Sequence, residues 1–109
     1  MAHAELRLPP TSGDLLRADA QPYFLWWTNT TVSEFEQRLR DPSSERRAYW
    51  LGALLREANT RDVWLFTTPE QIRSLWPLLI RHLGRSRARW AWLLDIDDVG
   101  WPPAPEPSA

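Results

Sequence analysis

The sequence predicts an all-α protein: a compact bundle of about four to five short helices, with an extended aromatic segment on its N-terminal side and disordered termini. Two observations carry this prediction. Apolar residues recur at spacings of three and four between residues 32 and 95, which is the period of helices with one buried face. No stretch alternates apolar and polar residues over the length of a strand, so no sheet is expected.

The chain divides into three regions, and its 109 residues fit one domain. Residues 1–21 show little periodicity and are expected to form a flexible arm with one short helical turn at residues 14–18. Residues 22–96 form the predicted helical domain, in which the aromatic run Pro22–Trp27 packs across the helices as a clasp. Residues 97–109 end in PPAPEPSA and are expected to be a Pro-rich disordered tail.

Two helix starts carry strong capping signals. Thr31 followed by Glu34 matches a capping box, which predicts a helix over Val32–Arg40. The segment Thr68–Gln71 combines an N-cap threonine, a proline at the first helical position and a glutamine at the third. It predicts a helix that ends at Gly84, because glycine commonly terminates helices.

The other boundaries rest on single residues. Asp41 followed by Pro42 predicts the start of a helix that ends near Asn59, and Thr60 is expected to cap a short helix over Arg61–Phe66.

The last two predicted helices carry further expectations. Pro77 lies inside the helix that follows Thr68 and predicts a kink or break near Leu75, because proline cannot donate its backbone hydrogen bond. The last helix is predicted over Ser86–Asp95, with three residues on its inner face: Trp90, Leu93 and Leu94.

Tryptophan is the unusual component of the sequence, with eight in 109 residues. A buried indole removes roughly 200 Å² from water, so most of the eight are expected to hold the helices together. More indoles than a small core can enclose would leave an aromatic patch on the surface, which is typical of a binding site. We therefore expect the surplus to face another macromolecule.

Arginine supplies all 13 basic residues, and the net charge of −1 lacks the basic excess typical of nucleic-acid binding. Four arginines nevertheless fall within nine residues: Arg81, Arg85, Arg87 and Arg89. Two helices joined at this point would resemble a helix-turn-helix with arginines at the start of its second helix. Trp90 and Trp92 in that helix count against DNA contact, as do the acidic residues that follow. A solvated arginine face that pairs with those acids is the simpler interpretation.

No catalytic or cofactor motif is found in the sequence. It has no glycine-rich phosphate or dinucleotide loop, no nucleophile elbow and no zinc-protease motif. Without cysteine, it forms neither disulfides nor zinc–thiolate sites. We interpret His82 as a solvent-facing helix residue, and Asp95, Asp97 and Asp98 as a solvated acidic turn. We therefore expect no enzyme, no cofactor and no bound metal. Without an apolar bilayer-spanning run or a signal peptide, a cytoplasmic protein is expected.

Three segments between residues 22 and 95 carry a family resemblance: PYFLWWTNTTVSEFEQRL, LLREANTRDVW and TPEQIRSLWPLLIRHLGRSRARWAWLL. They resemble a family of short uncharacterised bacterial proteins with an aromatic first segment, a long helix, a threonine- or serine-capped helix and a closing W-x-x-x-L helix. Members are often encoded beside an abortive-infection-type nucleotidyltransferase toxin, which implies an antitoxin role. Trp27 stands where the family commonly has aspartate. The matching positions imply fold determinants and no catalytic residue: Phe24, Trp26, Trp64, Ile72, Trp90 and Leu94.

The sequence and this resemblance together predict a protein-binding module, an antitoxin that neutralises its cognate nucleotidyltransferase toxin by covering the active cleft. Two alternatives stay open: a helix-turn-helix-like regulator that binds operator DNA, and a small helical-repeat scaffold. No small-molecule substrate and no membrane are expected as partners. The candidate partner-binding residues are aromatic or cationic: Trp26, Trp27, Arg81, Arg85, Arg87, Arg89 and Trp92.

Overall fold

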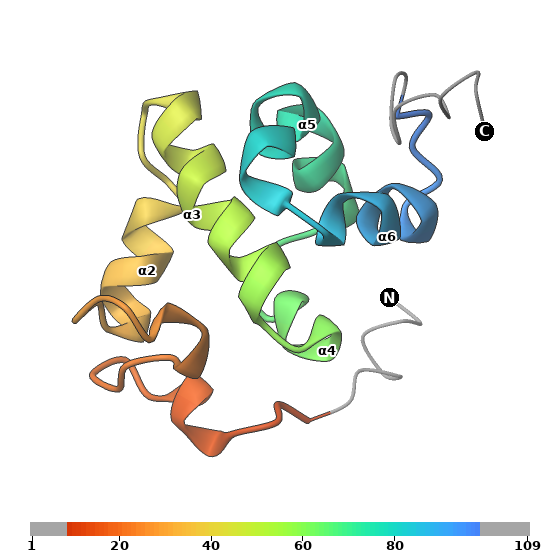
Figure 1. Cartoon of the computed structure of the whole chain (residues 1–109). Coiled ribbons are helices and arrows are strands. Elements are labelled where there is room, and N and C mark those ends of the chain that lie inside the picture. The colour runs from red at the N-terminus through yellow and green to blue at the C-terminus, as the bar shows by residue number, and fades with distance from the viewer. Residues whose placement is uncertain (1–8, 99–109) are drawn as a thin grey trace.

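The computed structural model describes residues 9–98, and every regular element in this part of the chain is a helix (Figure 1). Two short 3-10 helices, η1 and η2, precede five α-helices, α2 to α6. The bounds are Gly13–Leu16 (η1), Tyr23–Leu25 (η2), Val32–Arg38 (α2), Ser44–Glu57 (α3), Thr60–Val63 (α4), Pro69–Leu83 (α5) and Ser86–Leu93 (α6). The predicted all-α class is confirmed.

Two predicted helix starts are confirmed at atomic detail. At α2, the Thr31 hydroxyl accepts the backbone N–H of Glu34 at 3.2 Å, and the Glu34 carboxylate accepts the backbone N–H of Thr31 at 2.9 Å. This capping box lowers the pKa of Glu34, chiefly through the hydrogen bond from the Thr31 backbone. At α5, the Thr68 hydroxyl accepts the backbone N–H of Gln71 at 3.2 Å, and Pro69 occupies the first helical position.

The predicted start of α3 is wrong. The helix begins at Ser44, because the Ser43 hydroxyl accepts a first-turn N–H at 3.3 Å and acts as the N-cap. The Asp41 carboxylate instead accepts the backbone N–H of Ser43 at 2.8 Å. It therefore stabilises the turn that precedes the helix.

Asn59, expected to end α3, instead caps α4, because its side chain accepts the backbone N–H of Arg61 at 3.3 Å. α4 ends at Val63 and does not reach Phe66 as predicted. The Phe66 ring packs edge-on against Phe24 and Phe35, with ring centroids 5.6 and 5.3 Å away. These aromatic contacts stabilise Phe66 in its position outside the helix.

A kink or break was predicted near Leu75; α5 runs as one helix over its whole length, so there is no break. A proline such as Pro77 inside a helix costs about 3 kcal/mol. The same helix buries four apolar side chains: Ile72, Trp76, Leu79 and Leu83. Burying side chains of this size stabilises the fold by roughly 1.5–3 kcal/mol each, so packing outweighs the proline. The helix ends at Gly84 as predicted, with a φ of 53°.

α3 lies at the centre of the fold, with α2 on one side and α5 and α6 on the other (Figure 1). Gly52 allows the close approach of α5, because a Cβ added there would lie only 2.5 Å from the Cβ of His82. Trp90 joins α6 to α3: its fully buried indole donates a hydrogen bond to the carbonyl of Leu55 at 2.8 Å. The same indole packs edge-on against Trp64.

Parts of the N-terminal segment, for which a flexible arm was expected, contact the helices. Leu15 in η1 is 3% exposed and belongs to the core. The backbone N–H of Thr11 donates to Oδ1 of Asp62 at 2.8 Å, and the Thr11 hydroxyl donates to Oδ2. η1 overlaps the helical turn expected at residues 14–18. Residues 1–8, the rest of the predicted arm, lie outside the described residues.

α6 ends two residues before its predicted end, in a Schellman motif. Asp95 has a φ of 54°, and the N–H groups of Asp95 and Ile96 donate to carbonyls of the last helical turn. Trp90 and Leu94 are buried as predicted, but Leu93 is 42% exposed, so its predicted inward position is wrong. Leu94 follows Trp90 by four positions and shares its face, whereas Leu93 falls at the edge of that face. Of the predicted tail, residues 99–109 lie outside the described part.

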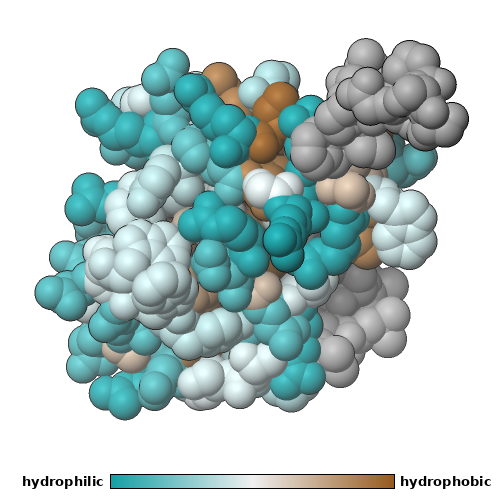
Figure 2. All heavy atoms as spheres, viewed as in Figure 1, coloured by the Kyte–Doolittle hydropathy of each residue, from teal (hydrophilic) through white to brown (hydrophobic). Residues whose placement is uncertain are grey.

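The face shown in Figure 2 is mostly hydrophilic, and its apolar residues gather near α5. Within residues 9–98, no helix is both long and apolar enough to cross a membrane.

Candidate functional site

The seven tryptophans among the described residues differ widely in exposure. Two are buried and three are half-buried against the core: Trp76, Trp90, Trp27, Trp50 and Trp64. Trp26 and Trp92 are 70% and 79% exposed. Because exposing an indole to water is unfavourable and these two serve little packing, they mark the candidate site.

The first part of the site lies directly after η2. Trp26 and Trp27 pack edge-on, with ring centroids 5.4 Å apart, and Trp27 rests against the core. The guanidinium of Arg56, near the C-terminal end of α3, lies 5.6 Å from the centre of the Trp27 ring. This is within the range of a cation–π interaction, and the Nε of the same guanidinium pairs with the carboxylate of Glu57 at 2.8 Å.

Arg56 also joins this aromatic pair to α5. Its Nη1 donates to the backbone carbonyl of His82 at 2.7 Å, in the last turn of α5. The exposed side chain of Arg81 lies next to His82 in sequence. Nη2 of Arg89 in α6 is 3.5 Å from the carbonyl of Leu55, the residue before Arg56. The C-terminal end of α3 therefore contacts both the last turn of α5 and the side chain of Arg89 in α6.

The exposed face of α6 carries a second group of aromatic and cationic side chains. Arg85, Arg89 and Trp92 are spaced by four and three residues, so they share one side of the helix, and all three are exposed. Residues 71–94 contain five arginines and neither aspartate nor glutamate. We name the whole set the Trp–Arg surface, which comprises Trp26, Trp27, Arg56, Arg81, Arg85, Arg89 and Trp92.

A buried carboxylate fixes the segment that presents the exposed indole. Asp62 is fully buried, and its Oδ2 accepts the Tyr23 hydroxyl at 2.6 Å. The Tyr23 oxygen in turn accepts the backbone N–H of Asn59 at 2.6 Å. Burial alone would raise the pKa of Asp62, but hydrogen bonds from Thr11 and Tyr23 outweigh it and lower that pKa. η2 is thus tied to α4, which holds Trp26 in place.

The same network acts on the tyrosine. Burial, followed by the hydrogen bond to Asp62, raises the pKa of Tyr23, so the phenol stays protonated and keeps donating. The network is a structural anchor: three donors converge on one carboxylate.

Arg87 differs from the other predicted arginines. Its Nε and Nη2 donate to the two oxygens of Asp98 at 2.7 and 2.9 Å, and Nε1 of Trp76 donates to Asp98 at 3.2 Å. The Arg87 hydrogen bonds lower the pKa of Asp98. Both side chains are largely buried, so Arg87 ties residue 98 to α6 and is not part of the Trp–Arg surface. One residue of the acidic turn, expected to be solvated, is therefore a buried partner.

His82 faces α3, which makes the expectation of a solvent-facing residue wrong. The half-buried ring packs edge-on against Tyr49, and its Cβ lies above Gly52. Burial, with the nearby Arg81 and Arg56, lowers the pKa of His82. The imidazole is therefore a neutral packing group at neutral pH.

Sequence reasoning missed Arg56 and the Asp62 network. Arg56 has no linear signal, because its tryptophan is 29 positions earlier in the sequence and its carbonyl partner 26 positions later. Asp62 occupies a first-turn position that acidic residues favour for local reasons, which hides its burial.

Comparison of the chain with known protein families, with curated proteins and with solved structures found no match. Among residues 9–98, no group of three or more acidic, histidine or cysteine side chains is arranged to hold a metal ion.

Proposed function

We propose that this chain is a protein-binding module whose Trp–Arg surface covers the active cleft of a nucleotidyltransferase and so acts as its antitoxin. The observation that carries the binding role is the pair of exposed indoles, Trp26 and Trp92, in a setting of exposed arginines. Tryptophan and arginine dominate the binding energy of protein interfaces. Their anchors here are rigid, because η2 is tied to α4 and α6 is tied to α3.

The charge of the surface indicates the chemistry of the partner. Arg81, Arg85 and Arg89 are exposed, and no ion pair holds any of them within the described residues. Such a surface complements an acidic rim. A nucleotidyltransferase cleft that holds metal ions through carboxylates offers such a rim, so occlusion by arginine and indole side chains would exclude the nucleotide.

Operator DNA is the second candidate partner, and one contact favours protein over DNA. Arg87, which a helix-turn-helix would direct into the groove, is bound to Asp98 beside Trp76. An exposed indole such as Trp92 on a recognition helix is also poorly suited to reading base edges, for which polar side chains are used.

The test is co-expression with any nucleotidyltransferase whose gene lies beside that of this chain, followed by affinity capture and growth rescue. We expect a stoichiometric complex. Trp92→Ala should weaken it at least about thirtyfold, the effect of losing about 2 kcal/mol at a central anchor. Leu16→Ala is the matched control, because Leu16 is 70% exposed and lies outside the Trp–Arg surface. The affinity of the Leu16→Ala variant for the nucleotidyltransferase should not change.

A complex that tolerates both Trp26→Ala and Trp92→Ala would refute the use of this surface, and the lack of any complex would refute the antitoxin role. A salt titration with operator DNA separates the alternative. If binding to DNA weakens with a salt slope that Arg85→Ala reduces, the chain is a DNA-binding regulator.

A further inference from the structure

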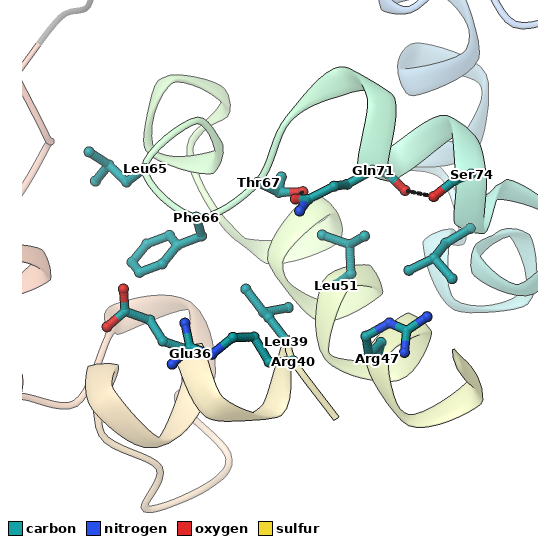
Figure 3. A pocket seen from close by; sticks show the side chains of 11 residues that line it. Glu36, Leu39, Arg40, Arg47, Leu51, Leu65, Phe66, Thr67, Gln71 and Ser74 are labelled. Carbon is teal, nitrogen blue, oxygen red and sulfur yellow. Dashed lines mark hydrogen bonds between the residues drawn. The ribbon is translucent and has the colours of Figure 1, made fainter. Parts of the chain in front are cut away.

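A cavity of about 430 Å³ opens between α2, α3, α5 and the linker before α5 (Figure 3). Its volume is within the range of small-molecule sites, roughly 300–1,000 Å³. It shares no residue with the Trp–Arg surface. The lining residues are Glu36, Leu39, Arg40, Arg47, Leu51, Leu65, Phe66, Thr67, Gln71, Ser74 and Leu75.

The floor of the cavity is apolar. Leu51 is buried, whereas Leu39, Leu65, Phe66 and Leu75 are only half-buried at the edge of the core. In Figure 3, Leu39 and Leu51 lie between Phe66 on one side and Arg47 on the other. An apolar group placed on this floor would remove the remaining exposed surface from water.

The polar groups around the floor include several donors. The Thr67 hydroxyl donates to Oε1 of Gln71 at 2.9 Å, so the acceptor of that amide is occupied and its NH₂ group is left to donate. Arg47 is fixed by donating to the backbone carbonyl of Asp41 at 2.7 Å.

Arg40 differs from Arg47, since its side chain makes no hydrogen bond or ion pair with any residue from 9 to 98. Two guanidinium groups therefore face a single carboxylate in the lining, that of Glu36. The lining therefore carries more positive than negative charge, and the guanidinium of Arg40 is available to a ligand.

We infer that this cavity binds a small amphipathic carboxylate, with its apolar body on Leu39, Leu51 and Phe66 and its carboxylate on Arg40. A planar guanidinium matches a carboxylate with two parallel hydrogen bonds. The apolar floor disfavours an inorganic anion, which would gain nothing from it. The ligand would bridge α2 to α3 and α5. This site is independent of the proposed antitoxin role, and neither depends on the other.

The probe is octanoate, titrated into the full chain and followed by calorimetry and by backbone amide NMR. We expect saturable binding with a Kd at or below about 1 mM, and amide shifts centred on the cavity. Octanol and octylammonium carry the same chain without the negative charge, and should bind at least about tenfold more weakly. Equal binding of octanol, or shifts centred on α6 instead, would overturn the inference.

Two variants test the assignment of residues. Arg40→Ala should weaken octanoate about threefold to fivefold, the effect of a partly exposed charge contact. Arg81→Ala removes the same charge outside the cavity and should leave the affinity unchanged. Ser74→Trp places a large side chain at the rim from an exposed position of α5 and should abolish binding. Unchanged affinity in Arg40→Ala would overturn the inference, whatever Ser74→Trp does.

Discussion

Replacing Gly52 with alanine should force apart the two helices that form the centre of the fold. The added Cβ would lie 2.5 Å from Cβ of His82 and 3.4 Å from its Cγ. A Cβ atom cannot move by changing its rotamer, so α3 and α5 must separate until the contact reaches at least about 3.4 Å, an ordinary van der Waals distance. The contacts around Trp90 and Leu79 would loosen with that movement.

The expected magnitude is the difference between two opposing effects. Alanine stabilises a helix interior by about 1 kcal/mol relative to glycine. Overpacking a well-filled core costs typically about 1–3 kcal/mol, and a contact between two backbone-anchored atoms falls at the upper end. The net destabilisation of Gly52→Ala should therefore be about 1–2 kcal/mol, which lowers Tm by about 5–15 °C in a domain of this size.

The assay is urea unfolding followed by tryptophan fluorescence and far-ultraviolet circular dichroism. Gly13→Ala is the control, because a Cβ at Gly13 meets nothing within 4 Å, and its stability should change by less than about 0.5 kcal/mol. His82→Ala keeps the clashing Cβ and should not rescue Gly52→Ala, whereas His82→Gly should recover part of the loss. A rise in stability on Gly52→Ala would refute the close approach of the helices.

Three further substitutions test the buried polar contacts. Asp62→Asn should lower the free energy of unfolding near neutral pH. The pKa of Asp62 is lowered in the folded state, so the carboxylate stabilises the fold only while it is ionised. In urea titrations, the difference in stability between the original chain and Asp62→Asn should therefore shrink as the pH falls below the ordinary aspartate pKa. Trp90→Phe should cost about 2 kcal/mol in chemical unfolding, since the Leu55 carbonyl loses the shorter of its two donors, and a loss below about 0.5 kcal/mol would count against that hydrogen bond. Arg87→Ala should destabilise by about 1–3 kcal/mol in thermal unfolding and Arg85→Ala by less than about 0.5, because only Arg87 is held by a largely buried carboxylate; equal effects would contradict this. The pKa of that carboxylate, Asp98, is lowered, so the Arg87 contribution should be lost on acidification.

Much of the fold follows from local signals in the sequence. Thr31 and Thr68 each combine a hydroxyl cap with a matching residue three positions later, and the helices begin where these signals predict. The start of α3 was misplaced because Asp41 and Ser43 are both good caps two positions apart. Local propensity cannot decide between them, because the tertiary path of the chain decides it.

The candidate site was predicted only in part. The exposure of Trp26 and Trp92 matches the expected surplus of indoles, but their sequence neighbours Trp27 and Trp90 pack inward. Composition gives the number of indoles but not which of them are buried and which are exposed, because that depends on residues distant in the sequence. Arg56 illustrates this, because its two partners are far from it in the sequence.

The hydrogen bonds to Asp98 define how short a folded fragment can be. A fragment cut after Ile96, at the limit suggested by hydrophobic periodicity, would lose the carboxylate that receives donors from both Trp76 and Arg87. Helix α6 would keep its C-terminal Schellman motif but lose the hydrogen bonds through which Asp98 joins Arg87 in α6 to Trp76 in α5. Expression of pieces that end before residue 98 should therefore yield a less stable protein than pieces that include it.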